Sequence, residues 1–499
     1  MPLITRFAPS PTGPFHIGNL HIALYNFLFA RKEGGKFLLR IEDTDIKRSD
    51  TIMTQNIIES LKWLGLEYDG EIYKQSDRFQ IYREYAELLI KNKLGYFCYC
   101  THEEIEERKQ MAMAKKESWK YDRKCLNLAN MNEIQDRPRA IRFLVPEGKV
   151  SYEDRIHNKM ERDAADIEDF VILKSDGTPS YNFACVIDDH ELNITDVIRG
   201  EDHVVNTFKQ VLLYKALGWK APKFVHLPMI LGPDRSKLSK RHGATLVLEY
   251  REQGFLPEAL INYIALLGWS PGGDREFISF PELIELFSLD RLSPTASIFD
   301  IKKLEWMNGE YINKMSDEEV LDRIVNFHEN REPTCPDAEC VGKTENRDYT
   351  NGVDAGPLTR IKLPENREYM LKVVNLLKPR MQKLTAFMER SAYFFNDPKE
   401  YDKEGMDKYF NLPETIERLA LVKERFSKLE AFSIEMIELA VRELADELGI
   451  KASLLIHPIR LALTGITGGP SLFHIVETLG KETVIRRLEK ALAFLIKAK

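Results

Sequence analysis

The first 42 residues carry two kinds of hydrophobic pattern. Residues 3–8 alternate as in a β-strand, and a Pro- and Gly-rich stretch at 9–14 ends that pattern. Apolar residues then recur at helical spacing over 18–32, and the run KFLLRIE at 36–42 predicts a second buried strand. This strand–helix–strand order is typical of a βαβ unit. We therefore predict a parallel sheet with a ligand at the carboxyl ends of its strands.

The pattern changes twice further along the chain. From Asp77 to about residue 180 a charged helix, a cysteine region and a β-prone stretch follow one another, and we interpret them as a module inserted into the sheet domain. From Tyr181 the β/α alternation resumes. After a Lys- and Arg-rich loop at 232–243, helical patterns continue to the end of the sequence. Within this region Ser316 and Glu319 have the spacing of a capping box, which predicts the start of a helix.

Length and composition narrow the possible classes. The 499 residues exceed one ordinary core and predict three or more domains. A net charge of -7 argues against a protein that coats nucleic acid non-specifically, although a local basic face is compatible with it. We expect a cytoplasmic protein. The N-terminal segment does not resemble a signal peptide, no run approaches a membrane span, and six cysteines are too few for a disulfide scaffold.

Two short motifs carry the candidate chemistry. In HIGN, at 16–19, a helix N-terminus offers unpaired N–H groups to a phosphate, Gly18 permits close approach, and His16 can donate a hydrogen bond. Alone, this motif is a weak signal and favours the alternative of a packed loop with a capping histidine. In KLSKR, at 237–241, two lysines can neutralise charge on a phosphate chain. The two motifs become specific together, because each follows a predicted strand of the same β/α region.

HIGN and KLSKR resemble the two signature sequences of class I aminoacyl-tRNA synthetases. The segments RFAPSPTG, LRIEDTD, YNFACVIDD, ITDVIRGEDH and PMILGPDRSKLSKRHG together resemble bacterial glutamyl-tRNA synthetases, and HPIRLALTGITGGPSLFHIVETLGKE is similar to the anticodon-binding end of that family. The resemblance covers nearly the whole chain. It implies an α/β fold, with a Rossmann-like catalytic domain that holds an inserted α+β module, followed by all-α anticodon-binding domains.

The resemblance also implies domain boundaries. The catalytic domain comprises 1–80 and 183–236, with an acceptor-stem module at 81–182 between them. A stem-contact helical domain at 237–315 begins with the KLSKR loop, and two helical anticodon-binding subdomains follow at 316–400 and 401–499.

The implied activity is ATP-dependent ligation of L-glutamate to the 3′ end of tRNA(Glu) through a glutamyl-adenylate, with release of AMP and diphosphate. The implied partners are tRNA(Glu), L-glutamate and ATP with Mg²⁺, no membrane is involved, and the family implies a monomer. A non-discriminating form that also glutamylates tRNA(Gln) is the open alternative. The long helical C-terminal region argues against a small-molecule nucleotidyltransferase on the same fold. An inactive RNA-binding protein is disfavoured because the chain retains His16, Lys237, Lys240 and Arg199.

The family roles carry over residue by residue. Attack of a carboxylate on the α-phosphate builds negative charge, so positioned cationic donors do most of the catalysis, and His16, Lys237 and Lys240 match that role. The residues that match the ATP site are His16, Gly18, Asn19, Asp202, Lys237, Ser239, Lys240 and Arg241.

An arginine fork suits the glutamate carboxylate, and Glu42 suits its ammonium group. The residues that match the glutamate site are Arg6, Ala8, Ser10, Glu42, Tyr181 and Arg199. Without the resemblance, Arg6 and Glu42 on adjacent strands would be interpreted as a structural ion pair, and Tyr181 as core packing.

Three cysteines, Cys98, Cys100 and Cys125, match a zinc site found in part of this family. One version adds a histidine two residues after the last cysteine, where this chain has Asn127. Another uses a tyrosine, and Tyr121 has a fitting spacing. Three thiolates and a phenolate can close a tetrahedral structural zinc site. The alternative is three reduced cysteines without a metal.

The sequence gives weaker evidence on the function of three further features. Arg380 is a candidate for reading the anticodon, with an ordinary solvated helix surface as its alternative. His21 is interpreted as packing or as tRNA-side surface. The polar stretch at 328–368 looks longer than the family norm and contains Cys335 and Cys340, which we interpret as incidental in a solvated loop.

Overall fold

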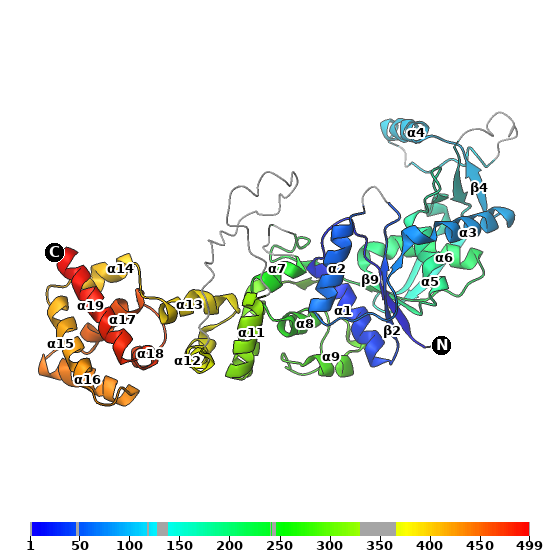
Figure 1. Cartoon of the computed structure of the whole chain (residues 1–499). Coiled ribbons are helices and arrows are strands. Elements are labelled where there is room, and N and C mark those ends of the chain that lie inside the picture. The colour runs from blue at the N-terminus through cyan, green and yellow to red at the C-terminus, as the bar shows by residue number, and fades with distance from the viewer. Residues whose placement is uncertain are drawn as a thin grey trace. The chain divides into compact units, whose positions relative to one another are not determined.

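The computed structural model describes residues 2–45, 49–116, 119–126, 138–239, 241, 246–329 and 366–498 (Figure 1). Lys240, Asn127, Cys335, Cys340 and most of the polar stretch at 328–368 lie outside these described residues. The chain divides into two compact units. The first comprises Met1–Arg251 and Pro257–Leu304, and the second comprises Glu252–Leu256 and Glu305–Lys499.

The first unit begins with the predicted βαβ unit. Strands β1 (Ile4–Phe7) and β2 (Lys36–Ile41) are parallel neighbours, and helix α1 (Ile17–Lys32) connects them. The short strand β3 (Tyr73–Lys74) extends the sheet beyond β2, and α2 (Thr51–Trp63) precedes it. The strand and helix patterns of the first 42 residues are therefore confirmed.

A second sheet has the strand order β7-β6-β10-β9. Its strands β9 (Asp196–Gly200), β10 (Lys223–Leu227) and β6 (Lys149–Asp154) are parallel, and β7 (Asn158–Asp163) runs antiparallel to β6. The Thr195 N–H donates to the Ile4 carbonyl at 3.0 Å, which places the start of β9 beside β1. Two helices accompany this sheet, α5 (Tyr181–Glu191) and α6 (Val204–Ala216).

The segment predicted as an inserted module, 81–182, contributes to two sheets. It supplies β6 and β7 to the sheet just described. It also forms a separate antiparallel sheet of β4 (Gly95–Cys98), β5 (Ala140–Phe143) and β8 (Val171–Leu173). Helix α3 (Phe79–Lys91) precedes this sheet, and α4 (His102–Ala114) follows β4. One hydrophobic cluster joins Tyr82, Phe143 and Phe183 from α3, β5 and α5.

Helices complete the first unit after the KLSKR loop. Tyr25 in α1 donates its hydroxyl to the carbonyl of Leu267 at 2.8 Å, so the loop that follows α8 is held against α1. The elements of this part are β11 (Ile230–Leu231), α7 (Val247–Glu252), α8 (Pro257–Ala265), α9 (Phe280–Leu286), β12 (Ser297–Ile298) and the start of α10 (Ile301–Lys314).

In the second unit every regular element that the structure describes is a helix, which confirms the all-α expectation. The Ser316 N–H donates to Glu319 at 2.8 Å and the Glu319 N–H donates to the Ser316 hydroxyl at 3.2 Å, so the predicted capping box is confirmed. No helix among the described residues is long and apolar enough to span a membrane. The longer helices are α11 (Asp317–Glu329), α12 (Arg367–Leu377), α13 (Thr385–Phe395), α15 (Thr415–Lys428), α16 (Ile434–Glu447), α17 (Ser453–Thr464), α18 (Leu472–Leu479) and α19 (Lys481–Ala498).

Five residues from the middle of the chain belong to the second unit, and we name 252–256 the crossover segment. The Gly254 carbonyl accepts the Leu384 N–H at 2.9 Å, and the Leu256 N–H donates to Asn308 at 2.8 Å. Gly254 has a φ of +81°, a conformation that favours glycine. The chain therefore passes between the two units three times.

Candidate active site

A pocket of about 480 Å³ lies at the carboxyl ends of the parallel strands β9 and β10 and beside the loop that follows β1. His16 follows β1, Gly200 ends β9 and Leu227 ends β10, and all three line it. Its volume is in the range of small-molecule sites. The structure thus has a pocket where the βαβ pattern predicted one. Six residues expected at an ATP site line it together: His16, Gly18, Asn19, Asp202, Lys237 and Ser239.

His16 is the N-cap of α1. Its Nδ1 accepts the Asn19 N–H at 3.3 Å, so the neutral ring carries its proton on Nε2. Burial and the nearby Lys237 ammonium lower the pKa of His16, which favours the neutral ring. The capping role and the donor role that the sequence left open are therefore compatible, because they use different nitrogens.

Gly18 has a steric reason in this loop. A Cβ at this position would lie 3.1 Å from both Cε1 and Nδ1 of His16. The glycine therefore leaves room for the His16 ring to fold over the first turn of α1.

The KLSKR loop reaches the pocket through only part of its length. Lys237 and Ser239 line the pocket, whereas Arg241 is not among the described residues that do so. Arg241 is exposed and forms an ion pair with Asp234 at 3.0 Å within the same loop. The structure therefore brings Lys237 and Ser239 together with HIGN, and leaves Arg241 beside them.

Arg199 and Tyr181 adjoin this pocket. Arg199 lies on β9, is 5% exposed, and places Nη1 3.5 Å from the Tyr181 hydroxyl. The same hydroxyl lies 3.0 Å from Nδ1 of His203, which lines the pocket. The expected glutamate residues Arg199 and Tyr181 are thus one side chain away from the expected ATP residues.

Arg6 lies in a network of buried charges. Its Nε donates to Asp189 at 3.0 Å, and Arg40 donates to the same carboxylate at 2.6 Å and to Glu42 at 3.0 Å. The alternative of an Arg6–Glu42 ion pair is therefore wrong, because Arg6 forms its ion pair with Asp189 of α5 and Glu42 forms its ion pair with Arg40. Burial raises the pKa of Glu42 by more than Arg40 lowers it.

Asp189 remains ionised in this network. Burial alone would raise the pKa of its carboxyl, but Arg6 and Arg40 outweigh burial and lower that pKa to about 2. One carboxylate thus balances the charge of Arg6 and shares in balancing Arg40.

Arg199 contrasts with Arg6, because its hydrogen-bond partners are neutral. It donates to Thr207 at 2.6 Å, to Gln210 at 2.7 Å and to Nε2 of His226 at 3.3 Å. Within the described residues Arg199 forms no ion pair. A buried guanidinium without an anionic partner favours an anionic ligand.

Ala8 and Ser10 lie on the loop that follows β1. Ala8 is partly buried and Ser10 is exposed. The Glu42 N–H donates to the Pro9 carbonyl at 2.9 Å, so the backbone between these two residues lies against Glu42. The structure thus places the loop with Ala8 and Ser10 beside Glu42, the residue expected to bind the substrate ammonium. Neither Ala8 nor Ser10 is among the described residues that line the pocket.

Sequence reasoning missed several polar residues of this region. Their partners are remote in sequence, and the signal that could have found them is a charged or polar side chain inside an apolar run, as in KFVHL and FACVIDD. The missed residues are Arg40, Asp154, Asp189, His203, Thr207, Gln210 and His226.

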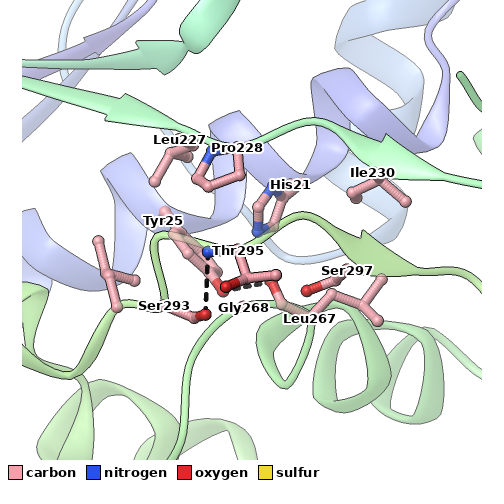
Figure 2. A pocket seen from close by; sticks show the side chains of 11 residues that line it. His21, Tyr25, Leu227, Pro228, Ile230, Leu267, Gly268, Ser293, Thr295 and Ser297 are labelled. Atoms are coloured by element: carbon pink, nitrogen blue, oxygen red, sulfur yellow. Dashed lines mark hydrogen bonds between the residues drawn. The ribbon is translucent and has the colours of Figure 1, made fainter. Parts of the chain in front are cut away.

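A second cavity beside α1 is much smaller, about 10 Å³ (Figure 2). His21 and Tyr25 line it with ring centroids 4.2 Å apart, opposite Leu267 of the loop after α8 and Ser297 of β12. His21 is 5% exposed, and burial lowers its pKa to about 4. The packing interpretation of His21 is therefore confirmed. The cavity is too small for a substrate.

The cysteine cluster forms a separate candidate site. The sulfur atoms of Cys98, Cys100 and Cys125 lie within 4.8 Å of one another, and the Tyr121 oxygen lies 3.3 Å from Cys98 Sγ and 3.5 Å from Cys100 Sγ. At usual bond lengths a tetrahedral zinc separates two thiolates by roughly 3.8 Å and a thiolate from an oxygen by roughly 3.5 Å. The four side chains therefore fit the geometry of a closed zinc site.

Two guanidinium groups face this cluster. Nε of Arg142 lies 3.3 Å from Cys98 Sγ, and Nη2 of Arg108 lies 3.1 Å from Cys100 Sγ. The Arg142 guanidinium also lies 3.7 Å from the centroid of the Tyr121 ring. Donors of this kind suit ligands that become anionic when they bind a metal.

Arg380 lies far along the chain, in the second unit. It ends a one-turn helix, Lys378–Arg380, and its side chain is exposed. Its position is compatible with contact to a large ligand.

Comparisons with known proteins agree with this geometry. The family described as "tRNA synthetases class I (E and Q), catalytic domain" matches residues 2–306, and the family described as "Anticodon binding domain" matches 350–492. The chain is 42% identical to a glutamate–tRNA ligase of Desulforudis audaxviator over 506 residues, which is 98% of this chain and 96% of the relative. It is 43% identical to the glutamate–tRNA ligase of Moorella thermoacetica, with 97% of each chain covered.

A solved structure extends the similarity to three dimensions. The glutamate tRNA ligase of Elizabethkingia meningosepticum, crystallised in complex with its amino acid, has a TM-score of 0.84 and 32% identity, and 99% of this chain and 100% of that one are covered. The chain therefore belongs to the class I tRNA synthetases of the glutamate and glutamine group, within the family of the glutamate–tRNA ligases.

Proposed function

We propose that this protein ligates L-glutamate to the 3′ end of tRNA(Glu) in two steps. Glutamate first attacks ATP to form glutamyl-adenylate and diphosphate, and the terminal ribose of tRNA then takes the acyl group and releases AMP. The observation that carries the proposal is the position of Arg199, a buried cation without a carboxylate partner among the described residues, next to the HIGN pocket. Such a site suits a carboxylate placed beside a phosphate chain.

Aminoacylation of purified tRNAs tests this activity. We expect labelled glutamate to be esterified to tRNA(Glu) in the presence of ATP and Mg²⁺, and glutamine to give no product. Failure to charge tRNA(Glu) would contradict the proposal. The same assay with tRNA(Gln) tests the non-discriminating form, which no observation on this chain favours.

The ATP site of the proposal combines the two motifs. His16 and Lys237 line the pocket. We assign the Nε2–H of His16 and the ammonium of Lys237 to the stabilisation of negative charge that develops on the α-phosphate. Gly18 and Asn19 offer the first turn of α1, and Ser239, Asp202 and Arg241 complete the set. Mg²⁺, bound together with ATP, would supply positive charge that neutralises the phosphate chain.

Lys240 is assigned to the same role from the family motif. We expect Lys240→Ala to lower the rate of pyrophosphate exchange, measured with tRNA present, by about 10²–10³-fold. The KM for glutamate should change much less, because the loop acts on phosphate. An exchange rate equal to that of the unmodified protein would remove Lys240 from the catalytic set.

The glutamate site of the proposal is built around Arg199. Its Nη1 receives the side-chain carboxylate, together with the Tyr181 hydroxyl, and Arg6 adds a second cation that Asp189 already balances. Glutamine is rejected because it would leave the desolvated guanidinium unpaired. Glu42 binds the substrate ammonium, and Ala8 and Ser10 close the pocket from the loop after β1.

A structural zinc ion belongs to the proposal as well. Its ligands would be Cys98, Cys100, Tyr121 and Cys125, and the metal would cross-link β4 to the segment that contains Tyr121 and Cys125. The donor set and its spacing support it. Elemental analysis of protein purified without chelators tests it, with about one zinc per chain expected, and protein free of zinc would contradict it.

Three finer expectations rest on family membership. We assign Arg380 to anticodon recognition, because it is exposed within the matched anticodon-binding region. We also expect a cytoplasmic monomer. Light scattering on the purified protein should give the mass of one chain, and the mass of two chains would contradict the monomer.

A further inference from the structure

We propose that the buried couple of Asp154 and His226 is a positioning device for Arg199 and thereby sets the affinity for the amino acid. His226 lies on β10 directly opposite Arg199 of β9, and Asp154 ends β6 on the other side of β10. All three side chains are buried. The inference rests on the proposed contact of Arg199 with the substrate carboxylate, and it concerns two residues to which that proposal gives no role.

Most of the donors of Arg199 are used for holding it. Nε points to His226 Nε2 at 3.3 Å, and Nη2 donates to Thr207 at 2.6 Å and to Gln210 at 2.7 Å. Nη1 has a single long hydrogen bond within the described part of the chain, to the Tyr181 hydroxyl at 3.5 Å. Hydrogen bonds therefore hold the guanidinium along the edge that carries Nε and Nη2, and the edge that carries Nη1 faces Tyr181.

The hydrogen bonds determine which nitrogen of His226 carries the proton. An arginine can only donate, so Nε2 of His226 must accept from Arg199 and must be unprotonated. The proton then lies on Nδ1, which is 2.7 Å from the Asp154 carboxylate. The Thr207 hydroxyl lies 2.8 Å from the same Nε2 and donates to the His203 carbonyl at 3.1 Å. Asp154 thus orients a neutral ring whose acceptor faces a cation.

Asp154 is itself held in place by four N–H groups. Its Oδ1 accepts the N–H groups of Ile156 and His157 at 2.9 Å each, and its Oδ2 accepts the backbone N–H of His226 at 3.1 Å as well as the ring. Burial would raise the pKa of this carboxyl, but the bonds from His226 and from the backbone outweigh burial and lower it. The carboxylate is therefore a fixed anion behind the ring.

This arrangement orients Arg199 without neutralising it. The nearest carboxylate in the chain of contacts is separated from the guanidinium by a neutral imidazole, whereas Arg6 is paired directly with Asp189 at 3.0 Å. A carboxylate in direct contact would compete with the substrate for the cation. The couple thus provides geometry and leaves the charge available to glutamate.

Substitutions at position 226 separate the acceptor from the bulk of the ring. We expect His226→Phe to raise the KM for glutamate roughly tenfold or more, the usual effect of losing one hydrogen bond to a charged group. The KM for ATP should stay within about twofold. His226→Gln offers an amide oxygen near the position of Nε2, and it should keep the KM for glutamate within about threefold. Melting temperatures of all variants establish that they are folded.

Two results would overturn the positioning role: a KM for glutamate that is unchanged in His226→Phe, or one that rises equally in His226→Phe and His226→Gln. If His226→Phe does not fold, Thr207→Val takes its place. It removes the hydroxyl that contacts both Arg199 and His226, the same rise is expected, and an unchanged KM would count against the proposal.

Arg199→Met distinguishes this inference from the proposal beneath it. If Arg199→Met leaves the KM for glutamate unchanged, the carboxylate assignment fails and the positioning role fails with it. If Arg199→Met raises that KM while His226→Phe does not, the carboxylate assignment stands and only the positioning role is refuted.

Discussion

At position 18 the lack of a side chain lets the His16 ring fold over the first turn of α1. Nδ1 then caps the Asn19 N–H, and Nε2 is left for the pocket. A histidine that caps through one nitrogen has a fixed ring orientation, which is what a donor to a developing charge requires.

Gly18→Ala should therefore disturb catalysis through His16. The new Cβ would lie 3.1 Å from two ring atoms, so the ring must move. We expect pyrophosphate exchange to fall by roughly 10–100-fold, less than the loss of a whole donor. The KM for glutamate and the melting temperature serve as internal controls and should change little. Exchange at the original rate would show that the ring orientation is unimportant.

Asp189 illustrates how one buried carboxylate supports two arginines. We expect Asp189→Asn to lower the free energy of unfolding by about 3–5 kcal/mol, because it leaves Arg6 and Arg40 in a buried site without their shared anion. Urea denaturation measures this. Glu161→Gln removes an exposed partner of Lys149 on the same unit and should have no measurable effect.

The stabilisation by Asp189 should also depend on pH. Its pKa of about 2 in the folded protein lies below the ordinary value near 4, so the stabilisation is complete above that ordinary value and is lost as pH falls towards 2. The difference in unfolding free energy between the unmodified protein and Asp189→Asn should shrink over that range. A difference that is independent of pH would contradict the ionised network.

At the scale of elements, local pattern predicted most of what forms locally. The alternation at 3–8, the helical spacing at 18–32 and the capping box at Ser316 are confirmed because each depends on residues a few positions apart. The partners within the charged networks could not be predicted in this way. Asp154 and His226 are 72 residues apart, and Arg6 and Asp189 are 183 apart. Only the folded sheets bring them together.

The residues of the candidate site likewise fall into those that a local motif identifies and those whose partners are remote in the sequence. Motif spacing identified His16, Gly18, Asn19, Lys237 and Ser239, and all five line one pocket. Reasoning from adjacent strands left an Arg6–Glu42 ion pair as the alternative to a role of both residues in the glutamate site. It had no means of detecting that Asp189 of α5 accepts hydrogen bonds from Arg6 and Arg40. Residues that orient others carry no motif of their own.

Strand β5 and the residue before it carry two arginines that test the metal site. Arg142 contacts a thiol and the Tyr121 ring, whereas Arg139 stacks 4.0 Å from the centroid of the Phe97 ring. We expect Arg142→Met to weaken zinc binding about 10–100-fold, measured by competition with a chromophoric chelator. Arg139→Met is the matched control and should bind zinc as the unmodified protein does. Equal affinities in the two variants would argue against a role of Arg142.

At the scale of the whole molecule, the crossover segment links the order of the chain to its two units. Gly254 combines a φ of +81° with a close approach, because a Cβ there would lie 2.7 Å from the Thr385 nitrogen. Gly449, also in the second unit, has a φ of +64° and no atom within 4 Å of a Cβ. The two glycines share the backbone conformation and differ in the clash.

Gly254→Ala should therefore destabilise the second unit more than Gly449→Ala. We expect about 1–2 kcal/mol for the left-handed conformation at Gly449 and roughly 1–3 kcal/mol more at Gly254 for the clash. Thermal unfolding of both variants measures the difference. Equal melting temperatures would mean that the crossover segment relieves the clash with Thr385 without a loss of stability.

The crossover segment also restricts how this protein can be recombined with its relatives. The catalytic-domain match ends at residue 306, which invites an exchange of everything beyond that point. Such a chimaera would retain residues 252–256 from one parent while Asn308, Leu384 and Thr385, which bind them, came from the other. A workable exchange has to carry two stretches that are separate in the gene, because residues 252–256 and 305–499 form one compact unit.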